Sequence, residues 1–226
     1  MPNRKRQQTH AAKNALPQNA FSVERLETAY WIACENWRIW RADFEFTGHA
    51  GNLPILSKPE RHKAFLAEYN PLRGIAGKGE GSEGDLLYKQ LCKPGVFQRM
   101  INHSNGAGID TLNEELANHL LISKSKLSYL SKLATFSRPE TFLPWDSFAR
   151  KGVAKLNNGP AQGNYKKYVD FLSSANRVWD DHACNAIETF LNGRSISASN
   201  GHREGFSRRM LDVCLMLEGG RWKHSR

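Results

Sequence analysis

The chain has 226 residues, of which 40% are hydrophobic and 24% are charged, which is the balance of an ordinary globular protein. Its 32 lysine and arginine residues outnumber 22 aspartate and glutamate residues, so the formal net charge is +10. The apolar runs are far too short for a transmembrane helix, and no apolar stretch follows the polar start Met1–Arg6. We therefore expect a cytoplasmic protein with no membrane span and no secretory signal.

The positive charge is concentrated at the two ends and in one internal segment. Residues 1–20 carry four basic residues and no acidic one, residues 121–157 carry seven against two, and residues 203–226 carry six against three. Clustered basic residues attract polyanions, because their binding releases counterions condensed on nucleic acid. We expect nucleic acid as the partner and no membrane partner, since neither end shows an apolar helical face. The alternative is a basic protein with solvated ends.

The four cysteines do not predict a metal site, a cofactor or a disulfide framework. Cys34, Cys92, Cys184 and Cys214 lie far apart, and none forms a Cys-x-x-Cys pair. Buried, reduced thiols are the expected state of such cysteines.

The N-terminal part of the chain predicts a disordered basic arm over residues 1–19, followed by helices. Apolar residues recur every three or four positions from about Val23 to Asp43, which indicates one helix. Its two tryptophans fall in register with this stripe, so we expect them in the core. The stripe consists of Leu26, Tyr30, Ala33, Trp37, Trp40 and Phe44. A second helix should start at Ser57 to Pro59 and stop before Pro71.

The middle of the chain begins with a glycine-rich stretch, Gly74–Gly84. No strand precedes it and the spacing of a phosphate-binding loop is absent, so we expect a mobile surface loop. Short helices should follow over residues 85–92 and 96–101. The residues Thr111-Leu-Asn-Glu114 form a capping-box pattern that predicts a helix from there to about Leu121.

The remaining helices are predicted from caps and apolar spacing. Ser123 should cap a helix whose apolar face is Leu127, Leu130, Leu133 and Phe136, and Asp146 or Ser147 should cap one that ends near Leu156. The longest stripe predicts a central helix of roughly 27 residues. It contains Tyr165, Tyr168, Leu172, Ala175, Trp179, His182, Ala186 and Phe190. A last helix over residues 206–217 should close at Gly219-Gly220.

No alternating strand pattern occurs, so the expected fold is all-α with eight to ten helices. We expect one helical domain over residues 20–218, with the basic arm 1–19 before it and a basic tail, residues 219–226, after it.

The segment Ser131–Arg150 has the best candidate for chemistry. It predicts a helix, a turn bounded by Pro139 and Pro144, and then an aspartate at the N-terminus of the next helix. A carboxylate in that position accepts hydrogen bonds from helix-end amides and is stabilised by the helix dipole. In a cationic groove such a carboxylate could stabilise a developing sugar cation, or orient a water, when an N-glycosidic bond breaks.

The order Pro144-Trp-Asp146-Ser-Phe-Ala-Arg150 resembles the Pro-x-Asp-Thr/Ser-x-x-Arg element of the helix-hairpin-helix DNA glycosylase superfamily. About 30 of the 226 residues are covered by this resemblance. It implies an orthogonal helical bundle, DNA rather than RNA as the partner, and Asp146 as the catalytic residue acting on a flipped nucleotide.

Three features found in that superfamily are absent. The hairpin glycines have no counterpart in Leu120–Tyr129, and the positions of the lyase lysine hold Leu127 or Ser128. The four-cysteine iron–sulfur cluster of some members is missing too. The resemblance therefore implies base release through Asp146 without Schiff-base chemistry, and no cofactor.

Two functional hypotheses for this segment remain open. In the first, the protein is a nucleic-acid-associated enzyme, a DNA N-glycosylase-like hydrolase. In the second, it is a non-enzymatic helical module for nucleic acid or protein, and Asp146 is only a helix cap. Trp145 could stack on a base or pack under the turn, and Lys132 could pair with Asp146 or be solvated. The candidate nucleic-acid contacts are Lys124, Lys126, Lys132, Arg138, Trp145, Arg150 and Lys151.

Overall fold

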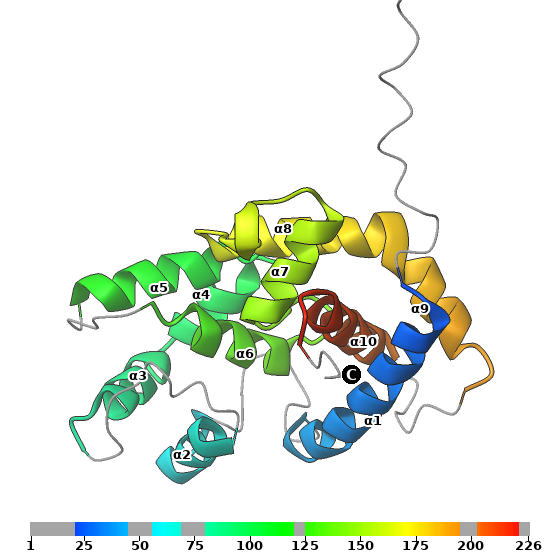
Figure 1. Cartoon of the computed structure of the whole chain (residues 1–226). Coiled ribbons are helices and arrows are strands. Elements are labelled where there is room, and N and C mark those ends of the chain that lie inside the picture. The colour runs from blue at the N-terminus through cyan, green and yellow to red at the C-terminus, as the bar shows by residue number, and fades with distance from the viewer. Residues whose placement is uncertain (1–20, 45–55, 69–79, 120–124, 195–202, 222–226) are drawn as a thin grey trace, which may run out of the picture.

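The computed structural model describes residues 21–44, 56–68, 80–119, 125–194 and 203–221, and within them every regular element is helical (Figure 1). The all-α prediction is therefore confirmed for this part of the chain. In chain order the α-helices are α1 Val23–Phe44, α2 Pro59–Glu68, α3 Glu83–Leu91, α4 Val96–Asn102, α5 Ala107–His119, α6 Leu127–Ser137, α7 Ser147–Leu156, α8 Tyr168–Val178, α9 Cys184–Leu191 and α10 Arg203–Glu218.

Five helix starts differ from the sequence prediction. The helix α8 begins at Tyr168 rather than near Tyr165, and α10 begins at Arg203 rather than at Phe206. The helix α5 begins at Ala107, so Thr111 lies inside it and the expected capping box does not open it. Asn105 caps α5 instead, because its Oδ1 accepts a hydrogen bond from the Ala107 amide at 3.0 Å. The helix α3 begins at Glu83, so the last residues of the glycine-rich stretch are helical. The N-cap of α6 is Lys126, and the expected cap Ser123 lies outside the described residues.

The predicted long helix is present, but a π-helical turn changes which face it buries. Residues Trp179–Ala183 form this turn between α8 and α9. A π turn accommodates an extra residue, so the face that points inward shifts. Beyond the turn the buried residues are Ala183, Ile187 and Leu191, whereas the predicted stripe residues Trp179, His182, Ala186 and Phe190 are only half-buried. The prediction of the stripe is therefore wrong after Val178.

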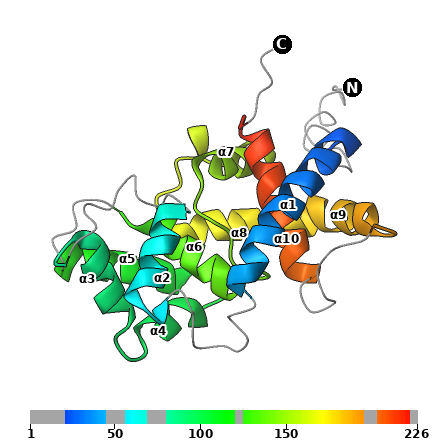
Figure 2. The same cartoon turned by 90° about the horizontal axis from the view of Figure 1, so that it is seen from below.

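Among the described residues, the helix with the largest number of buried residues is α10, not the long helix. Every residue from Gly205 to Met216 except Arg209 is buried, including the polar residues Ser207, Arg208 and Asp212. The helix packs between α1 on one side and α7 on the other (Figure 2). The core face of α1 includes Leu26, Tyr30, Ala33 and Trp37, as the sequence predicts, while the side chains of Trp40 and Phe44 lie outside the described part.

Two glycines allow α7 and α10 to approach each other. A Cβ atom on Gly152 of α7 would overlap the carbonyl oxygen of Leu215 on α10. A Cβ atom on Gly219, just after α10, would overlap the carbonyl oxygen of Phe148 on α7. This contact places Gly219 against the start of α7.

Tyr168 holds the loop that leads into α7. Its side chain is fully buried, and its hydroxyl donates to the Leu143 carbonyl at 2.6 Å and accepts from the Leu143 amide at 3.2 Å. Gly106 provides the space for the ring, because a Cβ there would lie 2.6 Å from the ring. Since Leu143 lies three residues before Asp146, Tyr168 fixes the path of the chain into the candidate site.

The N-terminus of α8 is capped from another helix. Asp110 of α5 accepts hydrogen bonds from the backbone amides of Tyr168 at 2.7 Å and Val169 at 2.9 Å. We expect Asp110→Ala to lower the free energy of unfolding by about 2 kcal/mol, because it leaves two helix-end amides without their acceptor. Denaturant unfolding checks this. Asp170→Asn, an exposed change in the same first turn, should shift it by less than about 0.5 kcal/mol.

The cysteine side chains are more exposed than the sequence predicts. All four cysteines are free, but only Cys214 is buried; Cys34 and Cys184 are half-buried and Cys92 is exposed. The expectation of four buried thiols is therefore wrong for three of them.

In the described part of the chain, no helix has the length and apolar character needed to cross a membrane.

Candidate functional site at the start of α7

Asp146 is the N-cap of α7, as the sequence predicts. Its Oδ1 accepts hydrogen bonds from the backbone amides of Phe148 at 2.8 Å and Ala149 at 3.3 Å. Its Oδ2 lies 3.7 Å from Nη1 of Arg221, beyond hydrogen-bond distance, and the side chain is 29% exposed. One carboxylate oxygen is therefore fixed by the helix end, while the other points toward a cation at the surface.

Four charged residues from other elements surround this aspartate. Lys132 on α6, Arg209 and Asp212 on α10, and Arg221 after α10 all interact electrostatically with one another or with Asp146. Arg209 and Asp212 form an ion pair, and the Asp212 side chain is only 1% exposed. We call Lys132, Asp146, Arg209, Asp212 and Arg221 the α7 charge cluster. It contains three cations and two carboxyl groups.

Burial changes the acid–base properties of the α7 charge cluster. Burial raises the pKa of Asp212 from 3.8 to about 6, and Asp146 adds to this rise, while Arg209, Arg221 and Lys132 oppose it. Burial also lowers the pKa of Lys132, although the negative charges of Asp146 and Asp212 act in the opposite direction. A buried carboxyl group that titrates near neutral pH beside a second carboxylate is typical of functional sites.

Trp145 packs under the turn in the structure. Its ring meets Phe171 at 5.5 Å in an edge-to-face arrangement and Tyr168 at 6.0 Å. The guanidinium of Arg150 lies 4.4 Å from the centre of the ring, and Nη1 of Arg150 donates to the Gly163 carbonyl at 3.1 Å. A nucleobase could stack on that face of Trp145 only after Arg150 moved away.

The other predicted nucleic-acid contacts are dispersed. Lys126 is 3% exposed and forms an ion pair with Glu83 at 2.8 Å, so its side chain does not lie on the surface. Arg138 donates to the Ile101 carbonyl at 3.1 Å and pairs with Glu140 at 3.5 Å. Lys151 lies over the Phe148 ring at 5.6 Å, on the same helix as Arg150. Lys124 lies outside the described residues. Of the predicted set, Lys132 and Arg150 interact electrostatically with Asp146 in the structure.

Sequence reasoning missed Arg209, Asp212 and Arg221. They follow Asp146 by more than sixty residues, and no spacing rule connects them to it. The only signal in the sequence is that charged residues interrupt the apolar face of the last helix. Buried charges of this kind are expensive and need partners, so they could have been flagged as a candidate site.

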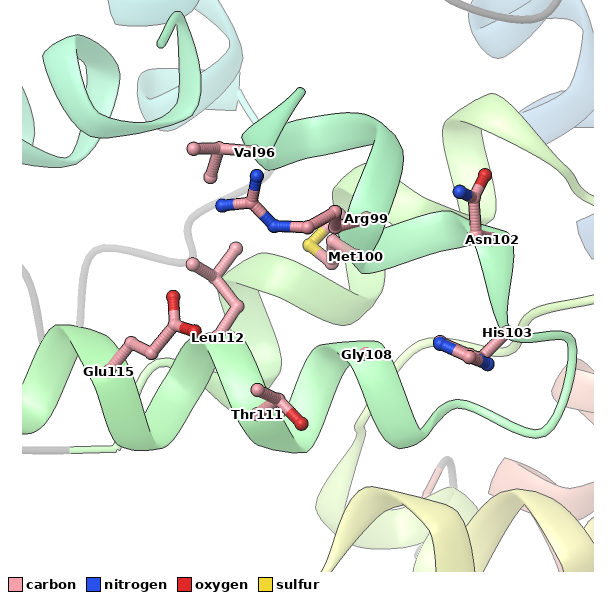
Figure 3. Close-up of a pocket in the computed structure, with 9 residues that line it drawn as sticks. All are labelled: Val96, Arg99, Met100, Asn102, His103, Gly108, Thr111, Leu112 and Glu115. Atoms are coloured by element: carbon pink, nitrogen blue, oxygen red, sulfur yellow. The ribbon is translucent and has the colours of Figure 1, made fainter. Parts of the chain in front are cut away.

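A cavity of about 210 Å³ lies elsewhere, between α4 and α5 (Figure 3). Its walls combine the apolar side chains of Val96, Met100 and Leu112 with the polar groups of Arg99 and Glu115. No member of the α7 charge cluster lines it. Among the described residues, no three histidine, cysteine or acidic side chains are grouped so that they could hold a metal ion.

Comparison with known proteins adds no relative. No protein family, curated protein or solved structure matches the chain. A function is therefore inferred from the geometry of the α7 charge cluster and from the short sequence motif around Asp146.

Proposed function

We propose that this protein is a cytoplasmic, nucleic-acid-associated protein that binds DNA rather than RNA and hydrolyses an N-glycosidic bond at the start of α7, with Asp146 as the catalytic carboxylate. One observation carries the proposal. Asp146 is held by helix-end amides through one oxygen, while its partly exposed side chain interacts electrostatically with three cations from α6, α10 and the turn after α10.

The order of the elements also supports the proposal. Helices α5 and α6 are joined by a short connection, and a proline-containing loop then leads to the aspartate that caps α7. This order agrees with the resemblance to helix-hairpin-helix DNA glycosylases that the motif around Asp146 implies. An orthogonal bundle like the core of that superfamily is part of the proposal.

The proposed reaction needs few groups. The nucleotide leaves the base stack, and the glycosidic bond breaks with its electron pair going to the departing base. The Asp146 carboxylate stabilises the positive charge that develops on the sugar, and its Oδ2 orients the water whose oxygen bonds to the anomeric carbon. The water gives up one proton to solvent, and the base takes one up. Lys132 and Arg221 lie beside the phosphate groups of the strand and balance their charge.

Asp146→Asn separates catalysis from capping. Asparagine caps helices about as well as aspartate, so this variant should keep its fold while it loses the negative charge. We expect base release to fall by about a hundredfold or more, with duplex affinity unchanged or slightly raised. The measurement uses duplexes that each contain one uracil, hypoxanthine, 8-oxoguanine or methylated adenine, and it detects the abasic product. Asp181→Asn, which removes an exposed aspartate in the π turn, is the charge-matched control and should leave base release unchanged.

A second candidate function is a non-enzymatic binding module. The two amide hydrogen bonds to Asp146 are sufficient for a cap, and Arg150 covers one face of Trp145. If the wild type binds duplex DNA in a salt-dependent manner but releases no base from any of the four probes, the binding module replaces the enzyme. If no duplex or single-stranded oligonucleotide binds in a salt-sensitive manner, the enzyme and the nucleic-acid-binding module are both ruled out.

A further inference from the structure

A second aspartate lies behind Asp146 within the α7 charge cluster. Asp212 lies on the buried face of α10, and its ion pair with Arg209 lies inside the protein. Its Oδ1 is buried without a hydrogen-bond partner. Leaving a buried carboxylate oxygen unsatisfied costs free energy, and such atoms in folded proteins need a specific explanation. A protonated carboxyl group reduces this cost, because its charge is removed.

Charged and titratable groups face Asp212 from every side. Lys132 comes from α6, Asp146 from the start of α7, and Arg221 from the turn after α10. The remaining neighbours that interact with it are Arg209, Arg208 and Cys214 on its own helix and Tyr168 on α8. Asp146 and Arg221 have 29% and 40% of their side chains exposed, and Lys132 and Arg209 are half-buried, whereas the side chain of Asp212 is only 1% exposed. Asp212 therefore acts on a ligand only through its neighbours.

We infer that Asp212 is a positioning residue of the proposed site, and that its protonation state sets how much positive charge the α7 charge cluster presents to nucleic acid. This inference depends on the proposed function for the identity of its ligand. When Asp212 is neutral, three cations are opposed only by Asp146. When Asp212 is ionised, it draws Lys132 and Arg221 inward and removes one unit of positive charge from the cluster.

The pH range of this change follows from the burial of Asp212. Its pKa is raised to about 6, so the carboxyl group releases its proton between about pH 5 and pH 7. Polyanion binding should therefore be tighter on the acid side of this range. One unit of charge near the phosphates corresponds to about a threefold to tenfold change in affinity at low salt.

The first test measures binding of an undamaged duplex by the full chain at about pH 5 and about pH 8. The wild type should lose affinity as the pH rises. Asp212→Asn, which carries no charge at either pH, should show a pH dependence smaller by about threefold to tenfold. Asp181→Asn should keep the wild-type dependence. If Asp212→Asn binds with the same pH dependence as the wild type, the inference is overturned.

The second test uses no nucleic acid and needs no variant to fold. Carboxyl-carbon NMR of wild-type protein labelled at aspartate should show one buried carboxyl group that titrates near pH 6, and the Asp146 resonance should move in the same step. If every aspartate titrates in the usual acid range, the inference is overturned even when base release is observed. If the coupled step is present and base release is absent, the coupling is supported and only the base-excision proposal fails.

Discussion

Replacing Gly152 with alanine should lower the free energy of unfolding by about 3 kcal/mol or more. The added Cβ would overlap the Leu215 carbonyl oxygen and approach the Leu215 Cα to 3.1 Å. These neighbours are helix backbone, so they cannot move aside as the end of a flexible side chain can. At an exposed helix position the same change would instead stabilise by up to about 1 kcal/mol. The sign of the effect therefore reports whether α7 and α10 are in contact here.

The measurement is chemical denaturation of Gly152→Ala beside Ser147→Ala, an exposed substitution at the first position of the same helix. The control should change the free energy of unfolding by less than about 0.5 kcal/mol. Because α10 carries Arg209 and Asp212, displacement of this helix should also separate them from Asp146. A neutral or stabilising effect of Gly152→Ala would contradict the packing of α7 against α10.

Acidification should destabilise the protein through His62. This residue is 2% exposed, and its Nε2 lies 2.5 Å from the hydroxyl of Tyr129, which is also buried. Burial raises the pKa of Tyr129 well above 10, so the hydroxyl keeps its proton and donates it to a neutral His62. Burial lowers the pKa of His62 from 6.5 to about 4. Between these values the unfolded chain binds a proton that the folded protein excludes, so stability is complete above about pH 6.5 and is lost as the pH falls toward 4.

His62 alone should contribute a loss of roughly 2–3 kcal/mol between about pH 7 and pH 4. Asp212 acts in the opposite direction, because its raised pKa makes the folded protein gain stability as the pH falls from about 6. His62→Gln isolates the histidine contribution, since glutamine can still accept from the Tyr129 hydroxyl but does not titrate. Its unfolding free energy should fall less with acid than that of the wild type. His103→Gln, at an exposed position, should behave like the wild type. Equal acid sensitivity of His62→Gln and the wild type would show that His62 is not buried as a neutral residue.

Capping residues and apolar spacing correctly predicted those helix features that depend on residues close together in the sequence. Asp146 caps α7 because its carboxylate reaches amides only two and three residues ahead, a distance that the sequence contains directly. The apolar spacing of α1 likewise placed Trp37 in the core. The prediction of a helix start at Thr111 was wrong because α5 already begins at Ala107, where the side chain of Asn105 accepts a hydrogen bond from the first helical amide. The apolar stripe of the long helix failed after Val178 because the π turn is a backbone irregularity that periodicity does not reveal.

The sequence by itself determined an all-α chain with an aspartate at a helix start, because caps and helical periodicity are set by residues within one or two turns of each other. Only the tertiary structure decided which charges surround that aspartate. The buried side chain of Lys126 pairs with Glu83. The close glycine contact between α7 and α10 places Arg209, Asp212 and Arg221 near Asp146. The physical reason is that the partner of a charge depends on which helix faces pack together, and that choice is made by side-chain volume across the whole core.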